Sequence, residues 1–209
     1  MTRVKFSTKQ QPVKYYLSSE NKYYIFICLN EEEIDEKEPY QDEIGYETVH
    51  YYVYDYEEVI VNKPEIDIDD VLANPENYIN YKLLKYKKEK ISKSKEILAD
   101  YLLKHPIKSS CHKNKEALYS ITEEKQSLMV RALLMYQSKI DAGIDAELRW
   151  NSTGNECEVW SIDEFKQLML EIDAVVNPLV STQQKYEKDI MNCTSKDEVD
   201  SIILVYGTR

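Results

Sequence analysis

Residues 46–63 read YETVHYYVYDYEEVIVNK, and this stretch decides the first part of the fold. Tyrosine, valine and isoleucine dominate it, and aromatic and β-branched side chains favour strands. Two shorter runs of similar composition precede it, at 13–18 and 22–29, and the Ser-Glu-Asn sequence between them is typical of a turn. We therefore predict a small tyrosine-rich antiparallel sheet over residues 1–63, ended by the sequence Lys63-Pro64-Glu65.

The acidic segment at residues 30–42 separates those strands and is predicted to be a loop. It contains the sequence EEEIDEKEP, in which charged side chains outnumber apolar ones. Charged side chains are rarely buried, so this segment is expected to face water.

A mainly helical region is predicted over residues 64–145, because apolar residues there recur at helical spacing. A short helix is expected at 66–73. A longer one should begin at Asn74-Pro75 and end near residue 105, since proline suits the first helical position after an asparagine cap. Residues 107–117 are polar and are expected to form a loop.

Sequence signals at both ends predict the next helix. Ser120 and Glu123 have the spacing of a capping box, in which each side chain bonds the other residue's backbone N–H. Gly143 supplies the residue that commonly follows a helix C-terminus. A helix is therefore expected between these signals.

Residues 146–209 form the third predicted segment. A β-hairpin is expected at residues 146–160, around the glycine-containing loop NSTGN. Helices should follow it, and Pro178 should kink or restart the first of them. Two capping boxes mark the helix starts: Ser161 with Glu164, and Ser195 with Glu198. The three segments together predict an α+β fold.

Charge is unevenly distributed along the 209 residues, although the chain carries a formal charge of −11. Residues 1–80 carry −11, residues 81–139 carry +8, and residues 140–209 carry −8. This pattern predicts either neutralisation within the molecule or a basic segment that binds a partner. No run reaches the roughly 18 apolar residues of a membrane span, and the first residues lack the apolar region of a secretory signal. We expect neither membrane binding nor secretion.

Enzyme signatures are missing from the sequence, and we expect no enzyme, with no catalytic, cofactor or metal residue to assign. Glycine is scarce, and the glycine-rich, serine-hydrolase and zinc-protease patterns do not occur. His105, Cys111 and His112 are the one conceivable metal cluster. Adjacent residues on a loop rarely bind the same ion, and no fourth ligand is evident.

The basic helix is the feature that most resembles a nucleic-acid interface. Its lysines are interleaved with tyrosines at 81 and 86, but it contains no arginine, the side chain that base readout favours. Direct nucleic-acid binding is therefore disfavoured against a solvated or internally paired helix. The lysines concerned are Lys82, Lys85, Lys87, Lys88, Lys90, Lys93 and Lys95.

Aromatic side chains supply the candidate partner surface. Tyrosine is enriched at interfaces because its ring is apolar and its hydroxyl is polar. The alternative is that alternate tyrosines pack the sheet against the helices, and more tyrosines, at 15, 16, 23 and 24, could serve either purpose. The predicted surface comprises Tyr51, Tyr52, Tyr54, Tyr56, Trp150 and Trp160.

Residues 110–209 carry a resemblance to a known family. Its motifs are SITEEKQ at 120–126, RWN at 149–151, EVWSIDEF at 158–165, NPLVSTQQ at 177–184 and TSKDEV at 194–199. With this layout the chain resembles a domain family of unknown function encoded beside tail-fibre and baseplate genes in phages and prophages. The motifs are structural, so the resemblance carries over no catalytic residue.

The resemblance implies a tail-associated role performed through protein–protein contact. The first expectation is an assembly chaperone for a tail-fibre or receptor-binding protein, acting in the host bacterial cytoplasm. The alternative is a structural baseplate or tail-fibre component of the virion tail, which would need a homo-oligomeric interface. The second alternative is an acidic phage inhibitor of a host nucleic-acid enzyme, for which the charge of residues 1–80 is the support.

Overall fold

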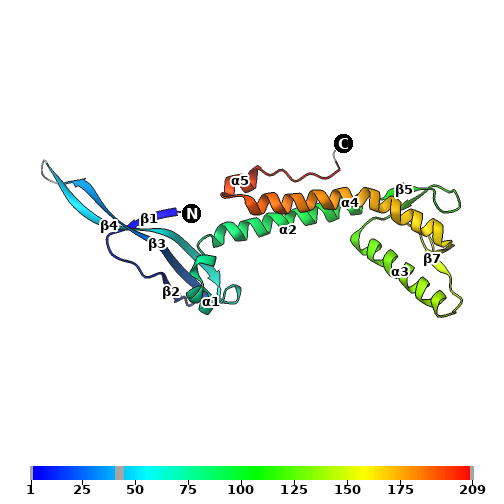
Figure 1. Cartoon of the computed structure of the whole chain (residues 1–209), viewed down its shortest axis with the longest axis horizontal. Coiled ribbons are helices and arrows are strands. Elements are labelled where there is room, and N and C mark those ends of the chain that lie inside the picture. The colour runs from blue at the N-terminus through cyan, green and yellow to red at the C-terminus, as the bar shows by residue number, and fades with distance from the viewer. Residues whose placement is uncertain (1, 41–44, 208–209) are drawn as a thin grey trace. The chain divides into compact units, whose positions relative to one another are not determined.

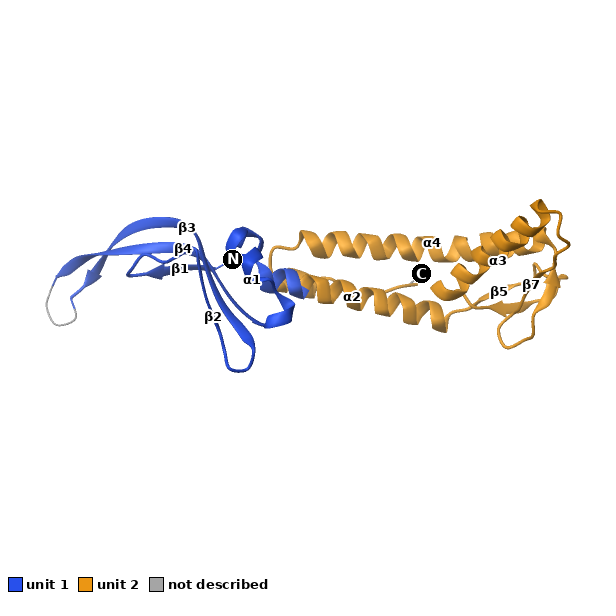
Figure 2. Ribbon diagram, turned by 90° about the horizontal axis from the view of Figure 1, so that it is seen from below, with its two compact units in different colours: residues 1–86 blue, residues 87–209 orange. Residues whose placement is uncertain are grey.

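A computed structural model describes residues 2–40 and 45–207, and it confirms the α+β fold class (Figure 1). The chain divides into two compact units, residues 1–86 (unit 1) and residues 87–209 (unit 2) (Figure 2). The boundary falls within a long helix, α2 (Tyr81–Lys104), inside the segment 64–145 that sequence analysis treats as one region. Each unit is described by itself below.

Unit 1 is built on a four-stranded antiparallel sheet in the order β1-β4-β3-β2. Its strands are β1 (Thr2–Phe6), β2 (Val13–Leu17), β3 (Lys22–Pro39) and β4 (Tyr46–Asn62). The predicted strands 13–18, 22–29 and 46–61 are all present, and β4 ends where Lys63-Pro64 predicts. The sequence analysis did not predict the first strand, β1.

The acidic segment is a strand as far as Pro39, so its prediction as a loop is wrong up to that residue. β3 continues to Pro39 and pairs with β4 along its length, across an irregularity between Leu29 and Glu32. Asn30 takes a left-handed conformation there (φ 54°), and its side chain donates to Asp55 over 2.6 Å. Pairing with β4 satisfies the backbone, while the charges stay exposed. Residues 41 and 42 lie outside the described residues.

One face of the sheet holds the core of unit 1. Tyr23, Ile25 and Ile27 of β3 alternate inward, as the period-2 rule requires, and Val59 and Val61 of β4 pair with them. α1 (Ile68–Ala73) covers this face through the fully buried Val71. The two short 3-10 helices are η1 (Lys63–Glu65) and η2 (Pro75–Asn77).

The predicted helix start at Asn74 is wrong. The side chain of Asn74 donates back to Asp70 over 2.8 Å and does not cap the turn ahead. Residues 75–77 form only the η2 turn, and α2 begins at Tyr81. Local hydrogen bonding by asparagine competes with its forward capping role.

Unit 2 is helical, with two small hairpins. Its helices are the rest of α2, α3 (Glu123–Asp141), α4 (Ile162–Asn192) and α5 (Lys196–Ser201). The strands are β5 (Ile107–Ser109) paired with β6 (Ala117–Tyr119), and β7 (Leu148–Trp150) paired with β8 (Glu158–Trp160). The predicted hairpin at 146–160 is present. Residues 107–117, predicted as a loop, contain β5 and the first residue of β6.

Helix termini in unit 2 follow the sequence in part. The capping box of Ser161 and Glu164 is formed. At α5 the Ser195 hydroxyl accepts from the N–H of Glu198, whereas the Glu198 carboxylate accepts from the backbone N–H of Thr194 over 2.6 Å. The box predicted at Ser120 is wrong, because Thr122 caps α3 by accepting from Lys125. Gly143 ends that helix in a left-handed conformation (φ 71°), and α4 passes through Pro178 without restarting.

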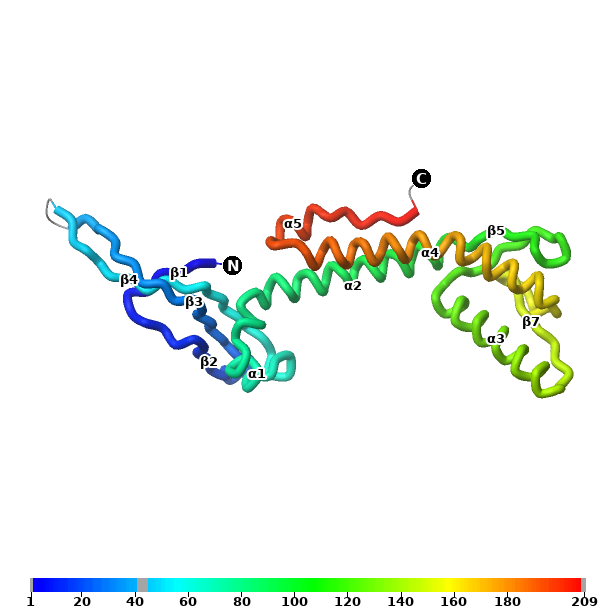
Figure 3. The backbone as a smooth tube through the Cα atoms, viewed as in Figure 1, coloured from blue at the N-terminus to red at the C-terminus, as the bar shows by residue number. Residues whose placement is uncertain are grey.

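The core of unit 2 lies where α4 meets α2, α3 and the hairpins. Phe165 and Leu168 of α4 are fully buried there, and Ile121 and Met129 join them. After α5 the chain turns back along α4 (Figure 3). The buried Tyr206 anchors this last segment, because its hydroxyl donates to the carbonyl of Ser94 in α2 over 3.0 Å.

Candidate partner-binding surfaces

The long strands of unit 1 project beyond their short neighbours as a two-stranded acidic ribbon. We give this name to residues 31–39 of β3 and 46–53 of β4 (Figure 1). β1 pairs with β4 only at residues 52–56, and β2 pairs with β3 only at residues 23–27. Within the described part of the chain, no further strand borders the outer part of the ribbon, so both of its edges present backbone N–H and C=O groups.

The acidic ribbon is named for its charge. It carries seven acidic side chains and one lysine, a net charge of −6. Three of the carboxylates are paired at its base: Arg3 Nη1 lies 2.8 Å from Glu32, and Lys5 and Lys9 pair with Glu36 and Glu31. The others have no lysine or arginine partner among residues 2–40 and 45–207, although His50 lies 2.7 Å from Asp35 and 3.7 Å from Glu33.

Two of those remaining carboxylates face each other. Glu38 of β3 lies directly opposite Glu47 of β4 in the register of the ribbon. Like charges in this arrangement destabilise a pair of strands. Glu38 also accepts a hydrogen bond from the Tyr51 hydroxyl, which is the largest cause of the raised pKa of Tyr51. The ribbon therefore keeps a charge arrangement that sheet stability alone disfavours.

The four predicted tyrosines of β4 do not form one surface. Tyr51 and Tyr52 are half-buried on opposite faces of the ribbon, Tyr51 beneath Lys5 and Tyr52 beside His50. Tyr56 is half-buried against Phe6.

Tyr54 is buried, with 2% of its surface exposed, so its place on the predicted surface is corrected. Its hydroxyl donates to Glu31 over 2.7 Å and accepts from the backbone N–H of Gln10 over 3.0 Å. The phenol therefore joins the ribbon base to the segment that follows β1.

Trp150 and Trp160 lie in unit 2, whereas the four tyrosines lie in unit 1. Trp160 is 4% exposed, which corrects its predicted role. It stacks on His112 and packs edge-on against Phe165. Trp150 is half-buried against the same phenylalanine, with Lys125 over its ring. Both indoles belong mainly to the core, because a ring of this size fills the space between a hairpin and α4.

An aromatic row lies on the sheet face opposite the unit 1 core. Tyr16 of β2 stacks on Tyr24 of β3, with ring centroids 4.7 Å apart, and it also contacts Phe26. Ile60 of β4 is exposed directly beside Tyr24 in the register. Side chains in the predicted strand at residues 22–29 alternate between two faces of the sheet. The sequence does not say which of these faces the rest of the unit covers.

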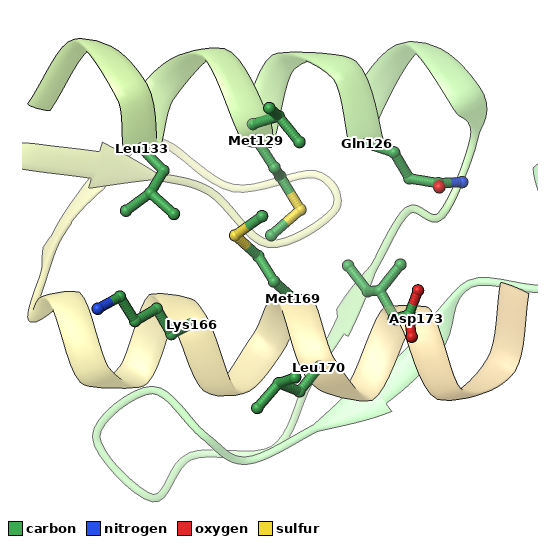
Figure 4. Close-up of a pocket in the computed structure, with 9 residues that line it drawn as sticks. Gln126, Met129, Leu133, Lys166, Met169, Leu170 and Asp173 are labelled. Carbon is green, nitrogen blue, oxygen red and sulfur yellow. The ribbon is translucent and has the colours of Figure 1, made fainter. Parts of the chain in front are cut away.

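Unit 2 contains an apolar groove of about 450 Å³ between α3 and α4. The two helices run antiparallel along it, with Met129 and Met169 at its centre (Figure 4). Lys166 and Asp173 lie at opposite ends of the α4 side (Figure 4). Sequence analysis missed this groove. The available signal was the run LMVRALLM at residues 128–135, which is more apolar than one buried helix face requires.

His112 lies in a cluster of polar side chains in unit 2. It is buried, and its ring nitrogens lie 3.4 Å from Glu164 and 3.3 Å from Glu158. Glu164 also accepts from the backbone N–H of Lys113 and Ser161, and these bonds lower its pKa from 4.5 to about 2. The neighbouring Lys113 ammonium pairs with Glu158.

The conceivable metal cluster is not assembled around one point. His105 stacks on Tyr101 and its ring bonds the carbonyl of that residue, whereas His112 stacks on Trp160. Across the described ranges, no three His, Cys, Asp or Glu side chains are placed to hold a metal ion. No helix in those ranges is long and apolar enough to cross a membrane.

Six of the eight lysines of α2 contact acidic or backbone groups within their own units. In unit 1, Lys82 lies 3.8 Å from Glu57 and Lys85 lies 3.2 Å from Glu65. In unit 2, Lys95 pairs with Glu187 over 2.8 Å. Lys87 there donates to the carbonyl of Met191 over 2.9 Å, a further contact within the unit.

Comparison of the chain with protein-family models, with curated proteins and with solved structures finds no match.

Proposed function

We propose that this protein binds another protein through the acidic ribbon of unit 1, as an assembly chaperone for a tail-fibre or receptor-binding protein. Contact with a protein is supported by the ribbon's structure. The tail-related identity of the client rests on the resemblance of residues 110–209 to the phage family.

The open edges of the acidic ribbon carry the proposal. An unpaired strand edge is a template for an added strand, because its N–H and C=O groups are free to continue the ladder. A folding or unassembled fibre chain offers such segments before its own strands have paired. Tyr51 adds apolar area beside the open edge of β4, and Tyr52 adds it on the other face of the ribbon, where β4 pairs with the end of β1.

The ribbon's charge gives the client contact its selectivity. A net charge of −6 attracts a basic segment and speeds its encounter, and it repels another copy of the ribbon. Charged edges also protect against uncontrolled strand pairing. A contact of this kind weakens as salt rises, which suits a chaperone that must release its client.

Inhibition of a host nucleic-acid enzyme is the second candidate, and the spacing of ribbon carboxylates favours it. Glu33 and Asp35 are exposed and two residues apart on one face of the strand. Alternate strand positions are separated by about 6.8 Å. Such a row of carboxylates would face successive cationic groups of a nucleic-acid-binding surface.

The experiment uses the full chain and a ribbon variant, E33K/D35K/E47K. Its control, E76K/E89K/E156K, changes the same number of exposed carboxylates outside the ribbon. Each is co-expressed with candidate tail-fibre and receptor-binding proteins from the same genome, and the soluble fraction of those proteins is measured. The chaperone proposal expects the wild type and the control to keep a fibre protein soluble, and the ribbon variant to fail.

Mass spectrometry of purified particles then separates the candidates. A chaperone should be missing from mature particles. Stoichiometric recovery of the chain would instead make it a baseplate or tail-fibre component. Normal particles and soluble fibres without the gene, together with ribbon-dependent inhibition of a host nuclease or polymerase, would establish the inhibitor.

A further inference from the structure

The groove between α3 and α4 exposes more apolar surface than unit 2 needs for its own core. Leu170 of α4 is 65% exposed and Leu134 of α3 is 62% exposed, while Val130, which lines the groove, is 48% exposed. Within α3, all of which is described, Met129 is the buried residue. Clustered exposed apolar side chains beside a groove are typical of an interaction site.

The α3 side of this surface is also poor in charge. Between Lys125 and Lys139, its one charged residue is Arg131. The one polar residue that lines the groove on α3 is the neutral Gln126. Depletion of charge at the centre of a patch is a property of protein interfaces.

Charge on the α4 side is restricted to the two ends of the groove. Lys166 and Asp173 are seven residues apart on the same helix face, about 10.5 Å along the axis. Met169 and Leu170 stand between them, so the midpoint of the four side chains lies between these two residues (Figure 4). Neither charged side chain has an ion-pair partner among the described residues.

The order of Lys166, Met169, Leu170 and Asp173 along α4 is self-complementary. A two-fold axis through that midpoint, perpendicular to α4, places Lys166 of one copy opposite Asp173 of the other, and does so twice. The same axis places Leu170 opposite Met169, and methionine adapts to the shape of its neighbour. Two-fold contacts have this reciprocal form, in which one patch binds its own copy.

We propose that the α3–α4 groove binds the same groove of a second copy of this chain, forming a two-fold homodimer. Four helices then pack together, α3 and α4 from each copy, with the apolar residues at the centre and the two Lys166–Asp173 pairs at the rim. A groove occupied by an unrelated helix would not need opposite charges at the two ends of its α4 side. The dimer is independent of the proposed chaperone function, because it uses unit 2 alone.

The test is a reciprocal charge exchange, followed by sedimentation velocity of the full chain at tens of micromolar and low salt. The wild type should sediment as a dimer, with twice the 24.7 kDa mass of one chain. K166D and D173K should each weaken dimerisation by on the order of ten-fold, because each places like charges opposite each other. The double variant K166D/D173K restores opposite charges across the axis and should regain the wild-type mass.

If the double variant regains the dimer, the single variants lost dimerisation through the contact between copies and not through damage to the fold. Residues 166 and 173 are too far apart along α4 for their side chains to pair within one chain. K185D, a single charge reversal on the exposed part of α4 outside the groove, is the matched control and should remain dimeric. L170D should be monomeric, because it buries a carboxylate at the centre of the contact.

Three outcomes would overturn the proposal. They are a monomeric wild type at these concentrations, a dimer that both single exchanges leave unchanged, and a double variant that stays as monomeric as its parents. Tryptophan fluorescence of each variant checks the fold, since Trp150 and Trp160 both lie in unit 2.

Discussion

The imidazole of His112 lies flat against the indole of Trp160, with ring centroids 4.1 Å apart and planes inclined by 8°. Both rings are buried, and Tyr119 and Phe165 pack edge-on against the indole. The β5–β6 connection is thereby fastened to the β7–β8 hairpin and to α4. The stack is a structural centre of unit 2, because it joins segments that are far apart in sequence.

Replacing His112 with alanine should lower the free energy of unfolding of unit 2 by about 2–3 kcal/mol, through the lost ring contact and the cavity left behind. H112F keeps a ring on the indole and should lose less. Urea unfolding followed by tryptophan fluorescence measures both. H105A is the matched control, because His105 makes a similar stack with Tyr101 at an exposed position. An H112A variant as stable as H105A would contradict the assigned role.

Stability of unit 2 should depend on pH through Glu164. Hydrogen bonds from Lys113 and Ser161 lower its pKa from 4.5 to about 2 in the folded state. A lowered pKa stabilises the fold fully above about pH 4.5, and this contribution is lost as the pH falls toward 2. The shift corresponds to at most roughly 3 kcal/mol. About 1–2 kcal/mol is expected, because the side chain is 29% exposed and screened.

The check is the urea midpoint of tryptophan fluorescence between pH 6 and pH 2.5, for the wild type and for E164Q. The glutamine still fits the capping box but does not titrate. The midpoint of E164Q should therefore fall less with acid than that of the wild type. Parallel curves would mean that other carboxylates govern the acid sensitivity of unit 2.

Two signals contained in a few neighbouring residues predicted the structure well. The capping box of Ser161 and Glu164 needs only residues three apart, and the structure forms it. The loop NSTGN likewise predicted the hairpin of β7 and β8, whose turn is closed by local bonds. In both places the backbone is satisfied by partners that are close in sequence.

Features that depend on distant partners were mispredicted or missed. Charge favoured a loop after Asn30, but pairing with β4 across the ribbon makes a strand of it. Tyr54 and Tyr51 have the same side chain but differ in burial. Phe6 of β1 and Gln10 of the segment after β1 contact Tyr54. The α3–α4 groove is lined by residues of two helices that are more than thirty positions apart in the sequence, which no local pattern aligns.

Replacing Tyr206 with phenylalanine should cost unit 2 about 1 kcal/mol. Its buried hydroxyl has one proton and faces two oxygen acceptors, the Ser94 carbonyl and Gln183 Oε1. One donor cannot fully satisfy both, so removing the hydroxyl removes about one hydrogen bond, while Gln183 Nε2 keeps its separate bond to Glu187. The loss should therefore be smaller than for a phenol that is the sole partner of a buried group.

Y206A is the companion variant and should cost about 3–5 kcal/mol, because it also removes the ring that anchors the final segment. Urea unfolding of both variants distinguishes the contribution of the hydroxyl to stability from that of the ring. Equal losses for Y206F and Y206A would show that the hydroxyl, and not the packing, holds this segment in place.

Replacing Pro178 with alanine should stabilise α4. Proline has no N–H to donate to the carbonyl of Ala174, one turn earlier, yet the helix continues through it. Alanine restores that bond and has the higher helix propensity, so the free energy of unfolding should rise by about 1–3 kcal/mol. N177A, at the neighbouring exposed position, controls for propensity alone and should gain no more than about 0.7 kcal/mol. A P178A variant less stable than the wild type would show that the conformation imposed by proline is needed to seat Leu179 in the core, since that leucine is buried one residue later.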